Sequence, residues 1–450
     1  MRRSILLLWP TACLLLVAVT LYVRRDQFTT AYFTQSHLSR PDGGDKHLPS
    51  QTGVLPSATS SGNQPALPLE TTALYVKAIM NIDTATLPHL ECPKLDPSRY
   101  QQLQVTNDAS EATIRYFFAL DLRQCVALLP RLIGSVVEAM RFLGPTNCAL
   151  SIIEGNSKDG TGEVLAALLP ELEALGVTYY FSTTAINPKK GDRITALAQL
   201  RNLAIQPLLD DTSITTSPTT PKPQRRTPPK PKYDPATTTI IFLNDVAICP
   251  EDILELVLQH TTLNADMVCA MDWTYVGADP TFYDVWIARA LSGDAFFEIP
   301  PDGSWDSAWN LFWNDEASRA RLGARQPFQV FSCWNGAVVF KAAPVMEGGV
   351  RFRRARKGEC HQGEPQLFCK DLWFGGYGKI AVVPVVNLEY SDEGGRKIKE
   401  AKGYTSRWVG SSDWRDEGIE WQTDPPEKVK CTAQYDNQFF EAWNKTQPGT

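Results

Sequence analysis

The sequence lacks the signatures of several common classes of protein. It contains neither the GxGxxG pattern of dinucleotide-binding folds nor the Walker pattern of P-loop enzymes. Its ten cysteines and five histidines form no CxxC pair and no Cys/His spacing of a zinc site. The net charge of -6 argues against a general affinity for nucleic acid. What remains is a folding chain of 450 residues with 43% hydrophobic content, enough for one large domain with appendages.

One long apolar run lies at the N-terminus, from Ser4 to Val23, with arginines on both sides. About 20 apolar residues suffice to cross a bilayer, and this run is longer than a typical signal-peptide core and has no small-residue cleavage site after it. We therefore predict a cytoplasmic tail at 1–3 and an uncleaved signal anchor at 4–23, with a cleaved signal as the alternative. The flanking charges balance and do not orient the span, but the long remainder after it favours a lumenal domain.

The composition changes twice after this run. Residues 24–68 are rich in Ser, Thr, Gly and Pro, as expected for a disordered stem that holds a domain off a membrane. The folded domain is expected at 69–450. Within it, a basic segment at about 210–236 with seven prolines is predicted to be a disordered insertion without a catalytic part.

Nine cysteines follow the predicted anchor. In an oxidising lumen we expect several of them to pair, and their odd number leaves at least one over. The sequence does not determine which cysteines pair. Asn444 begins an Asn-Lys-Thr glycosylation sequon, consistent with a secretory route.

The central feature of the domain is an apolar strand, Ile240 to Leu243, that ends in Asn244 and Asp245. In open α/β sheets, ligands bind at the carboxyl ends of strands. A second apolar strand, Met267 to Met271, also ends in a carboxylate. The pattern predicts a polar site at one edge of the sheet, with a carboxylate that caps the following turn as the alternative.

A βα unit of a parallel sheet precedes this strand. Residues 148–153 predict a strand and 163–175 a helix, and the loop between them carries Glu154 and Asp159. These carboxylates either hold the base or ribose of a nucleotide or cap the turn and helix.

Two arginines share one face of the next predicted helix, which begins at Arg193 and runs to about Ala204. Arg193 and Arg201 are spaced to meet a diphosphate together. The alternative is that they reach out to water or pair with surface acids.

Further polar candidates come late in the chain. Trp334 and Asn335 lie at a bend before a buried strand, where an indole and an amide suit a sugar ring, although a core tryptophan is the alternative. His361 has glutamates on both sides of it and is a candidate metal ligand. Glu364 begins a predicted helix and is either catalytic or a helix cap.

Taken together, these motifs resemble the fungal family of cryptococcal mannosyltransferase and capsule-associated proteins, glycosyltransferase family 69. The resemblance runs in order from about Ala112 to Ser391. It rests on residues 153–161, 193–202, 242–246, 282–289, 332–340, 358–360 and 364–373.

The resemblance implies a GT-A-like nucleotide-sugar-binding domain of Rossmann type, α/β in class, behind a single N-terminal membrane anchor. It implies a type II protein of the Golgi membrane that transfers mannose from GDP-mannose in α-1,3 linkage to a mannose-containing glycan of a capsule or cell wall, with Mn²⁺ or Mg²⁺. The expected donor-binding residues are Glu154, Asp159, Arg193, Arg201, Asn202, Asn244 and Asp245. The expected acceptor-binding residues are Trp334 and Asn335, the catalytic residues Glu364 and Asp371, and the metal ligands Asp245 and His361.

The sequence departs from the usual metal motif of such enzymes, because Asn244-Asp245-Val246 keeps one carboxylate of Asp-x-Asp. Mg²⁺ and Mn²⁺ accept carboxylate, water and phosphate ligands together, so one protein carboxylate is compatible with a metal. A transferase for another nucleotide sugar and a non-catalytic assembly factor for capsule or wall polysaccharide are the alternative functions.

Overall fold

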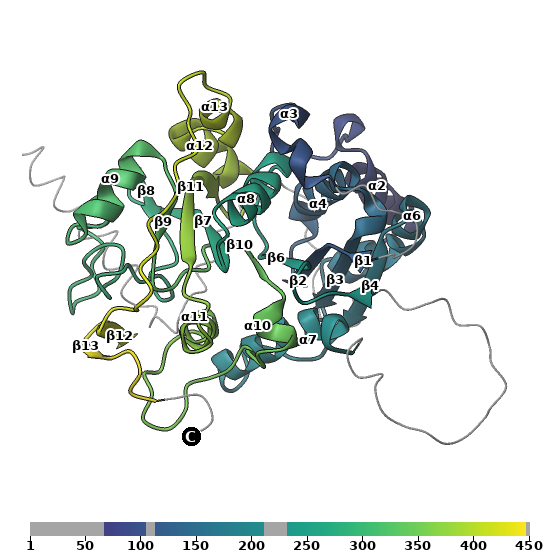
Figure 1. Ribbon diagram of the computed structural model, residues 1–450. Coiled ribbons are helices and arrows are strands. Elements are labelled where there is room, and N and C mark those ends of the chain that lie inside the picture. The colour runs from purple at the N-terminus through teal and green to yellow at the C-terminus, as the bar shows by residue number, and fades with distance from the viewer. Residues whose placement is uncertain (1–66, 105–112, 211–231, 447–450) are drawn as a thin grey trace, which may run out of the picture. The chain divides into compact units, whose positions relative to one another are not determined.

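The computed structural model describes residues 67–104, 113–210 and 232–446, which belong to one compact unit, Gln64–Thr450 (Figure 1). The predicted tail and anchor, the stem up to residue 66 and most of the predicted insertion lie outside these residues. Within the described ranges, no helix is long and apolar enough to span a membrane.

The end of the predicted insertion is ordered, which corrects its boundary. Lys232–Tyr233 form β5, which pairs in parallel with β1, Thr113–Ile114. The ring of Tyr233 is buried and meets Phe117 edge-on at 5.6 Å between centroids. The packing of the Tyr233 ring holds Lys232–Tyr233 against the sheet.

A nine-stranded mixed sheet forms the centre of the fold, in the order β4-β3-β2-β6-β10-β7-β11-β9, with β8 paired to β7. The neighbours β4, β3, β2 and β6 run parallel, as do β7 and β11. The strands are β2 (Tyr116–Leu122), β3 (Cys148–Glu154), β4 (Thr178–Thr183), β6 (Thr239–Leu243), β7 (Met267–Val276), β8 (Asp279–Phe282), β9 (Phe328–Gln329), β10 (Ala337–Lys341) and β11 (Ile380–Leu388).

The expectation of a parallel sheet is confirmed only in part. β10 runs antiparallel to both β6 and β7, and β9 runs antiparallel to β11. Residues 337–340 are all buried, and such an apolar run signals burial on both faces but not strand direction. β7 is also longer than predicted, so Asp272 lies within the strand and not after it.

The strand order reverses at β2. Along the chain, β3 and then β4 are added on one side of β2, whereas β6 is added on the other. Such a reversal opens a crevice at the carboxyl ends of the two strands that flank it, here β2 and β6. This crevice is where the polar strand ends meet.

Helices cover both faces of the sheet (Figure 1). One face packs against α4 (Leu129–Leu143), α5 (Thr161–Ala167), α6 (Leu169–Leu175) and α8 (Pro250–Thr262). The other packs against α7 (Arg193–Asp210) and α11 (Glu364–Phe374), near α10 (Ala343–Met346). The remaining elements are α2 (Leu69–Met80), α3 (Pro97–Tyr100), α9 (Glu316–Ala324), α12 (Asp392–Lys402), α13 (Thr405–Val409), β12 (Lys428–Gln434) and β13 (Asn437–Ala442).

Local sequence explains where the functional helices begin. Asp192 accepts a hydrogen bond from the Thr195 amide, an N-cap that starts α7 at Arg193. α7 runs past its predicted end near residue 204 and contains Pro207. In the predicted helix 163–175, the chain breaks at Leu168 into α5 and α6, ahead of Pro170.

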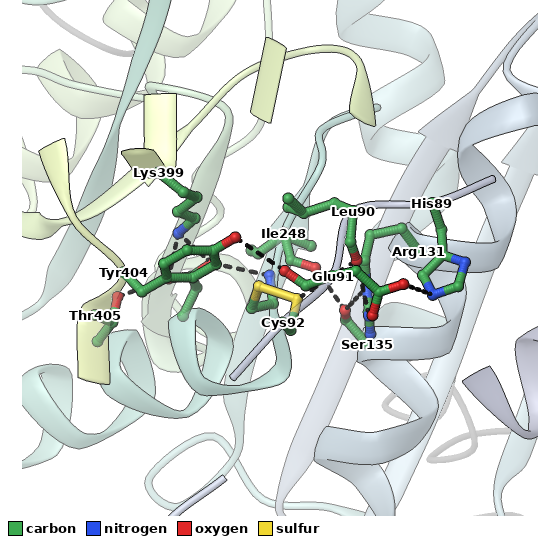
Figure 2. The surroundings of a disulfide bond; sticks show 12 residues. His89, Leu90, Glu91, Cys92, Arg131, Ser135, Ile248, Lys399, Tyr404 and Thr405 are labelled. Carbon is green, nitrogen blue, oxygen red and sulfur yellow. Dashed lines mark hydrogen bonds and ion pairs between the residues drawn. A yellow bond between two sulfur atoms is a disulfide. The ribbon is translucent and has the colours of Figure 1, made fainter. Parts of the chain in front are cut away.

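Three disulfides join distant parts of the described chain: Cys92–Cys249, Cys269–Cys333 and Cys360–Cys431. Cys125, Cys148 and Cys369 are free and buried. Figure 2 shows the first disulfide in a polar setting, where Arg131 donates to the Leu90 carbonyl and Tyr404 donates to the Glu91 carbonyl. These contacts fix the segment that leads into the sheet against α4 and the C-terminal helices.

Candidate active site

The crevice between β2 and β6 gathers charged side chains from four elements. Asp121 comes from β2, Asp245 follows β6, Arg201 comes from α7 and Glu364 starts α11. The charges of Arg201, Asp245 and Glu364 all act on the Asp121 carboxyl. The fold therefore brings together residues that are up to 243 positions apart in the chain.

Arg201 is the cation at the centre of this cluster. Its Nη1 donates to Glu364 Oε1 at 2.6 Å, and its guanidinium lies 4.7 Å from the ring centre of Trp334 and 5.8 Å from that of Phe352. The residue is 8% exposed, and its Nε has no hydrogen-bond partner in the described structure. Sequence reasoning placed Arg201 correctly on a shared face with Arg193 but did not predict the buried ion pair.

Glu364 is 2% exposed at the first turn of α11. Burial raises the pKa of Glu364, and the charges of Arg201 and, more weakly, Arg193 oppose that rise. Arg193, one end of the predicted diphosphate pair, therefore acts on the same carboxylate as Arg201. Both arginines predicted for the donor phosphates lie at this site.

Asp121 is the site residue that the sequence analysis missed. Burial raises the pKa of this carboxyl to about 7; Arg201 opposes the rise, and Asp245 and Glu364 add to it. Asp121 follows Phe117 and Ala119 on the face of β2 that packs under α7. A carboxylate within a strand of otherwise apolar residues was the available signal.

Asn244 and Asp245 differ in their surroundings. Asn244 is half-buried, receives the indole N–H of Trp334 at 3.0 Å and donates its own backbone N–H to Gly336. Asp245 is exposed at the mouth of the crevice. Of the two residues that keep the place of the usual metal motif, Asn244 thus fixes the turn and Asp245 faces outward.

Trp334 and Asn335 are buried, at 1% and 0% exposure. Asn335 has a positive φ of 52°, and its side chain donates to the Ala270 carbonyl while its backbone N–H donates to Asp284. These contacts show that both side chains are enclosed in the fold. Their role in binding an acceptor stays a prediction.

Two further carboxyls, those of Asp272 and Asp284, lie beside Asn335. Burial raises the pKa of Asp284 to about 6 and that of Asp272 well above its usual range, and each charge disfavours ionisation of the other. Tyr390 donates its hydroxyl to Asp272 at 2.6 Å. The pair shares the field of Arg201 and belongs to the same polar region.

Glu154 and Asp159 hold their loop together. Glu154 is 2% exposed and accepts the backbone N–H groups of Asn156 and Ser157. Asp159 accepts from the backbone of Val126 and from Thr161. The turn-capping alternative describes what these carboxylates do in this structure, and their donor-binding role stays a prediction.

The other predicted residues lie in separate surroundings. Both amide atoms of Asn202 bond the backbone of Phe352, and Asp371 forms a two-pronged ion pair with Arg353. His361 is exposed, and no recorded contact brings it to Asp245. The catalytic role of Asp371 and the metal role of His361 stay predictions. Asn444 is exposed just after β13, as an acceptor of a glycan must be.

The charges of the site determine what it can bind. Asp121, Asp245, Asp284 and Glu364 carry four carboxyls, against the two guanidiniums of Arg193 and Arg201. No group of three or more metal-ligating side chains occurs in the part of the chain that the structure describes. Mn²⁺ and Mg²⁺ nevertheless bind to one or two carboxylates when phosphates and water complete the shell. The surplus of carboxyls fits such a cation.

A charged cluster at the switch point of an open α/β sheet is the usual place of a ligand site in this class of fold. Comparison with known proteins specifies it. The model of the family described as cryptococcal mannosyltransferase 1 matches residues 115–371. The α-1,3-mannosyltransferase CMT1 of Cryptococcus neoformans is 32% identical over 427 residues, which are 89% of this chain and 85% of that protein.

The chain belongs to the cryptococcal mannosyltransferase family, as its motifs predicted, and it is an enzyme of the hexosyltransferase class. Solved structures resemble it only loosely. S. aureus TarS, residues 1–349, has a TM-score of 0.33 at 11% identity, and covers 62% of this chain and 60% of its own. The mannosyltransferase PcManGT of Pyrobaculum calidifontis, solved with GDP-Man and Mn²⁺, has a TM-score of 0.34 at 9% identity, with 72% and 65% covered.

Proposed function

We propose that this enzyme transfers mannose from GDP-mannose in α-1,3 linkage to a mannoside of a glycan or of a capsule or wall polysaccharide, with retention of configuration and with Mn²⁺ or Mg²⁺. The observation that carries the proposal is the buried Arg201–Glu364 pair beside carboxylates at the switch point. Family membership and the relative named an α-1,3-mannosyltransferase support the sugar and the linkage.

The chemistry follows from the charge that develops on the donor. As the bond to the sugar breaks, the departing diphosphate gains negative charge, and fixed cations stabilise it where it forms. Arg193 and Arg201 on α7 supply two of these charges, and Glu364 holds Arg201 in place. A divalent cation bound at Asp245 would act as a Lewis acid on the diphosphate oxygens.

Retention of configuration leaves two routes, a carboxylate nucleophile or attack from the same face with the leaving phosphate as base. Glu364 is 2% exposed, and its Oε1 is held by Arg201. A carboxylate in that position serves the arginine better than it serves an anomeric carbon, because one of its oxygens is engaged and the side chain is buried. The geometry therefore favours same-face attack for this enzyme.

We place the enzyme in the Golgi membrane as a single-pass type II protein with its catalytic domain in the lumen. The three disulfides of the described chain support an oxidising compartment, where such bonds form and persist. The exposed sequon at Asn444 and the apolar run at residues 4–23 support the same placement.

The test uses the full-length protein, purified in detergent and incubated with GDP-mannose, Mn²⁺ and an α-mannoside. We expect a mannosyl product that disappears with chelation and with Asp245→Ala, whereas the same substitution at the exposed turn residue Asp436 leaves it unchanged. GDP binding without product would indicate another sugar or acceptor. Absence of both would refute the proposal in favour of a non-catalytic assembly role.

A further inference from the structure

We propose that Asp121 and Asp245, which come from neighbouring strands, together hold one divalent cation against the donor diphosphate. This inference rests on the proposed function and extends it. It replaces the missing carboxylate of the Asp-x-Asp motif with one from a different strand. The two ligands would thus be supplied by the sheet and not by one short stretch of sequence.

Strand register places the two residues at the carboxyl ends of neighbouring strands. β2 and β6 are parallel neighbours, with Leu120 opposite Leu243. Asp121 is one residue beyond this pair, and Asp245 is two residues beyond it on the adjacent strand. Neighbouring strands lie about 4.8 Å apart. Oxygens bound to one Mg²⁺ at about 2.1 Å lie within about 4 Å of each other, a distance that two aspartate side chains at these positions can close.

The other carboxyls of the cluster are already engaged. Glu364 binds Arg201, and Asp284 accepts the backbone N–H of Asn335. Asp121 has no hydrogen bond or ion pair with another residue of the described structure, and it retains some exposure to solvent. The carboxylate oxygens of Asp121 are therefore available to a ligand at this place.

A second observation points to an anionic ligand at the same place. Arg201 is 92% buried, since 8% of it is exposed, yet its Nε–H has no acceptor in the described structure. A buried donor without an acceptor is costly, and a phosphate oxygen would satisfy it. The crevice thus offers an orphaned donor to an anion and paired carboxylates to a cation.

Charge balance joins the two observations. Each carboxyl of the crevice that is ionised repels a diphosphate that enters alone. A divalent cation held between the carboxylates and the phosphate oxygens removes this repulsion. A cation between Asp121 and Asp245 would let the arginines and these carboxylates face the same ligand.

The first experiment measures Mn²⁺ binding by the loss of the free-ion EPR signal, on the full-length protein with and without GDP. We expect one ion per chain in the presence of GDP, and binding at least about tenfold weaker in Asp121→Asn and in Asp245→Asn. The matched control is Asp266→Asn, a buried carboxylate just before β7, at the opposite edge of the sheet. It should bind Mn²⁺ as the unmodified protein does.

A second measurement needs no variant. Fe²⁺ in place of Mn²⁺, with ascorbate and peroxide, cuts the backbone beside the residues that hold the ion, and mass spectrometry locates the cuts. We expect cuts near residues 121 and 245. Cuts near 245 but not near 121 would overturn the inference, as would Asp121→Asn protein that binds Mn²⁺ normally.

The outcomes also separate this inference from the proposed function. Mn²⁺ bound through Asp121, in a protein that transfers no mannose, would support the site and refute the activity. Mannose transfer that persists at full rate in Asp121→Asn and in the presence of a chelator would refute the site and leave the activity standing.

Discussion

Breaking the Arg201–Glu364 pair should lower both the stability of the protein and its affinity for the donor. A double-mutant cycle at the two residues measures the contribution of the pair. The pair is 2.6 Å long, and both side chains are at least nine-tenths buried. Removing one partner of a buried pair leaves an uncompensated charge and typically costs about 3–5 kcal/mol. We expect Glu364→Gln to lower the free energy of unfolding by this amount, because a guanidinium cannot neutralise itself by losing a proton.

Arg201→Met should cost less, about 2–3 kcal/mol, because the abandoned Glu364 carboxyl can take up a proton. The burial that already raises the pKa of Glu364 would then act without opposition from Arg201. Met also keeps contact with the Trp334 ring. The double variant should lose less than the sum of the two single losses by about 2 kcal/mol or more, since neither charge is then left alone.

The assay is urea unfolding of the three variants and the parent, followed by GDP binding measured by calorimetry. Arg99→Met provides the control, because Arg99 forms a similar two-pronged pair with the buried Glu255 away from the crevice. It should lose stability without losing affinity for GDP, whereas Arg201→Met should lose both. Additive stability losses across the cycle, or GDP affinity unchanged in Arg201→Met, would refute this account of the site.

Three further predictions concern pH, the disulfides and the turn of the site. Burial lowers the pKa of His260 in the folded chain to about 3, whereas in the unfolded chain the imidazole keeps its usual pKa near 6.5. Below pH 6.5 the unfolded chain therefore takes up a proton that the folded chain does not. The free energy of unfolding should therefore decrease as the pH is lowered from about 6.5 towards 3, by about 2 kcal/mol at pH 5. Unfolding curves of His260→Leu should show a weaker dependence on pH. A dependence equal to the parent's would contradict this prediction. Cys360 and Cys431 close a loop of 71 residues, so replacing both by Ala should cost about 4 kcal/mol by chain entropy, seen as a lower Tm under non-reducing conditions. A Tm equal to the parent's would contradict it. Gly336 has a φ of +81°, and a Cβ there would lie 3.0 Å from a valine methyl, so Gly336→Ala should lower the free energy of unfolding by about 1–2 kcal/mol and weaken GDP binding. Gly277→Ala, at a φ of +80° in open space, should lower stability alone. Equal GDP affinity in the two variants would contradict this prediction.

The sequence predicted those parts of the site that lie next to a recognisable element. Arg193 and Arg201 share a face because helical spacing repeats every 3.6 residues, and α7 places both at the crevice. Asp245 was expected at a strand end, and β6 ends two residues before it. Family membership followed from the same motifs, since their order and spacing survive in a linear reading.

Residues whose meaning depends on a partner far along the chain were harder to interpret. Asn335 carries an amide of the kind that often contacts a sugar, but it is bonded to Ala270 and Asp284. Asp371 stands in a motif yet pairs with Arg353. Neither residue is adjacent in sequence to its partners, so no local pattern predicts these contacts.

The sequence by itself determined the main strands and helices around the site, the α/β class and the family, because apolar periodicity and motif spacing are local properties. The tertiary structure alone decided which charges meet. The reversal of strand order at β2 brings Asp121 beside Asp245, and the packing of α7 over the sheet brings Arg201 to Glu364. Electrostatic interaction depends on distance in space and on burial, and neither quantity is written in a stretch of sequence.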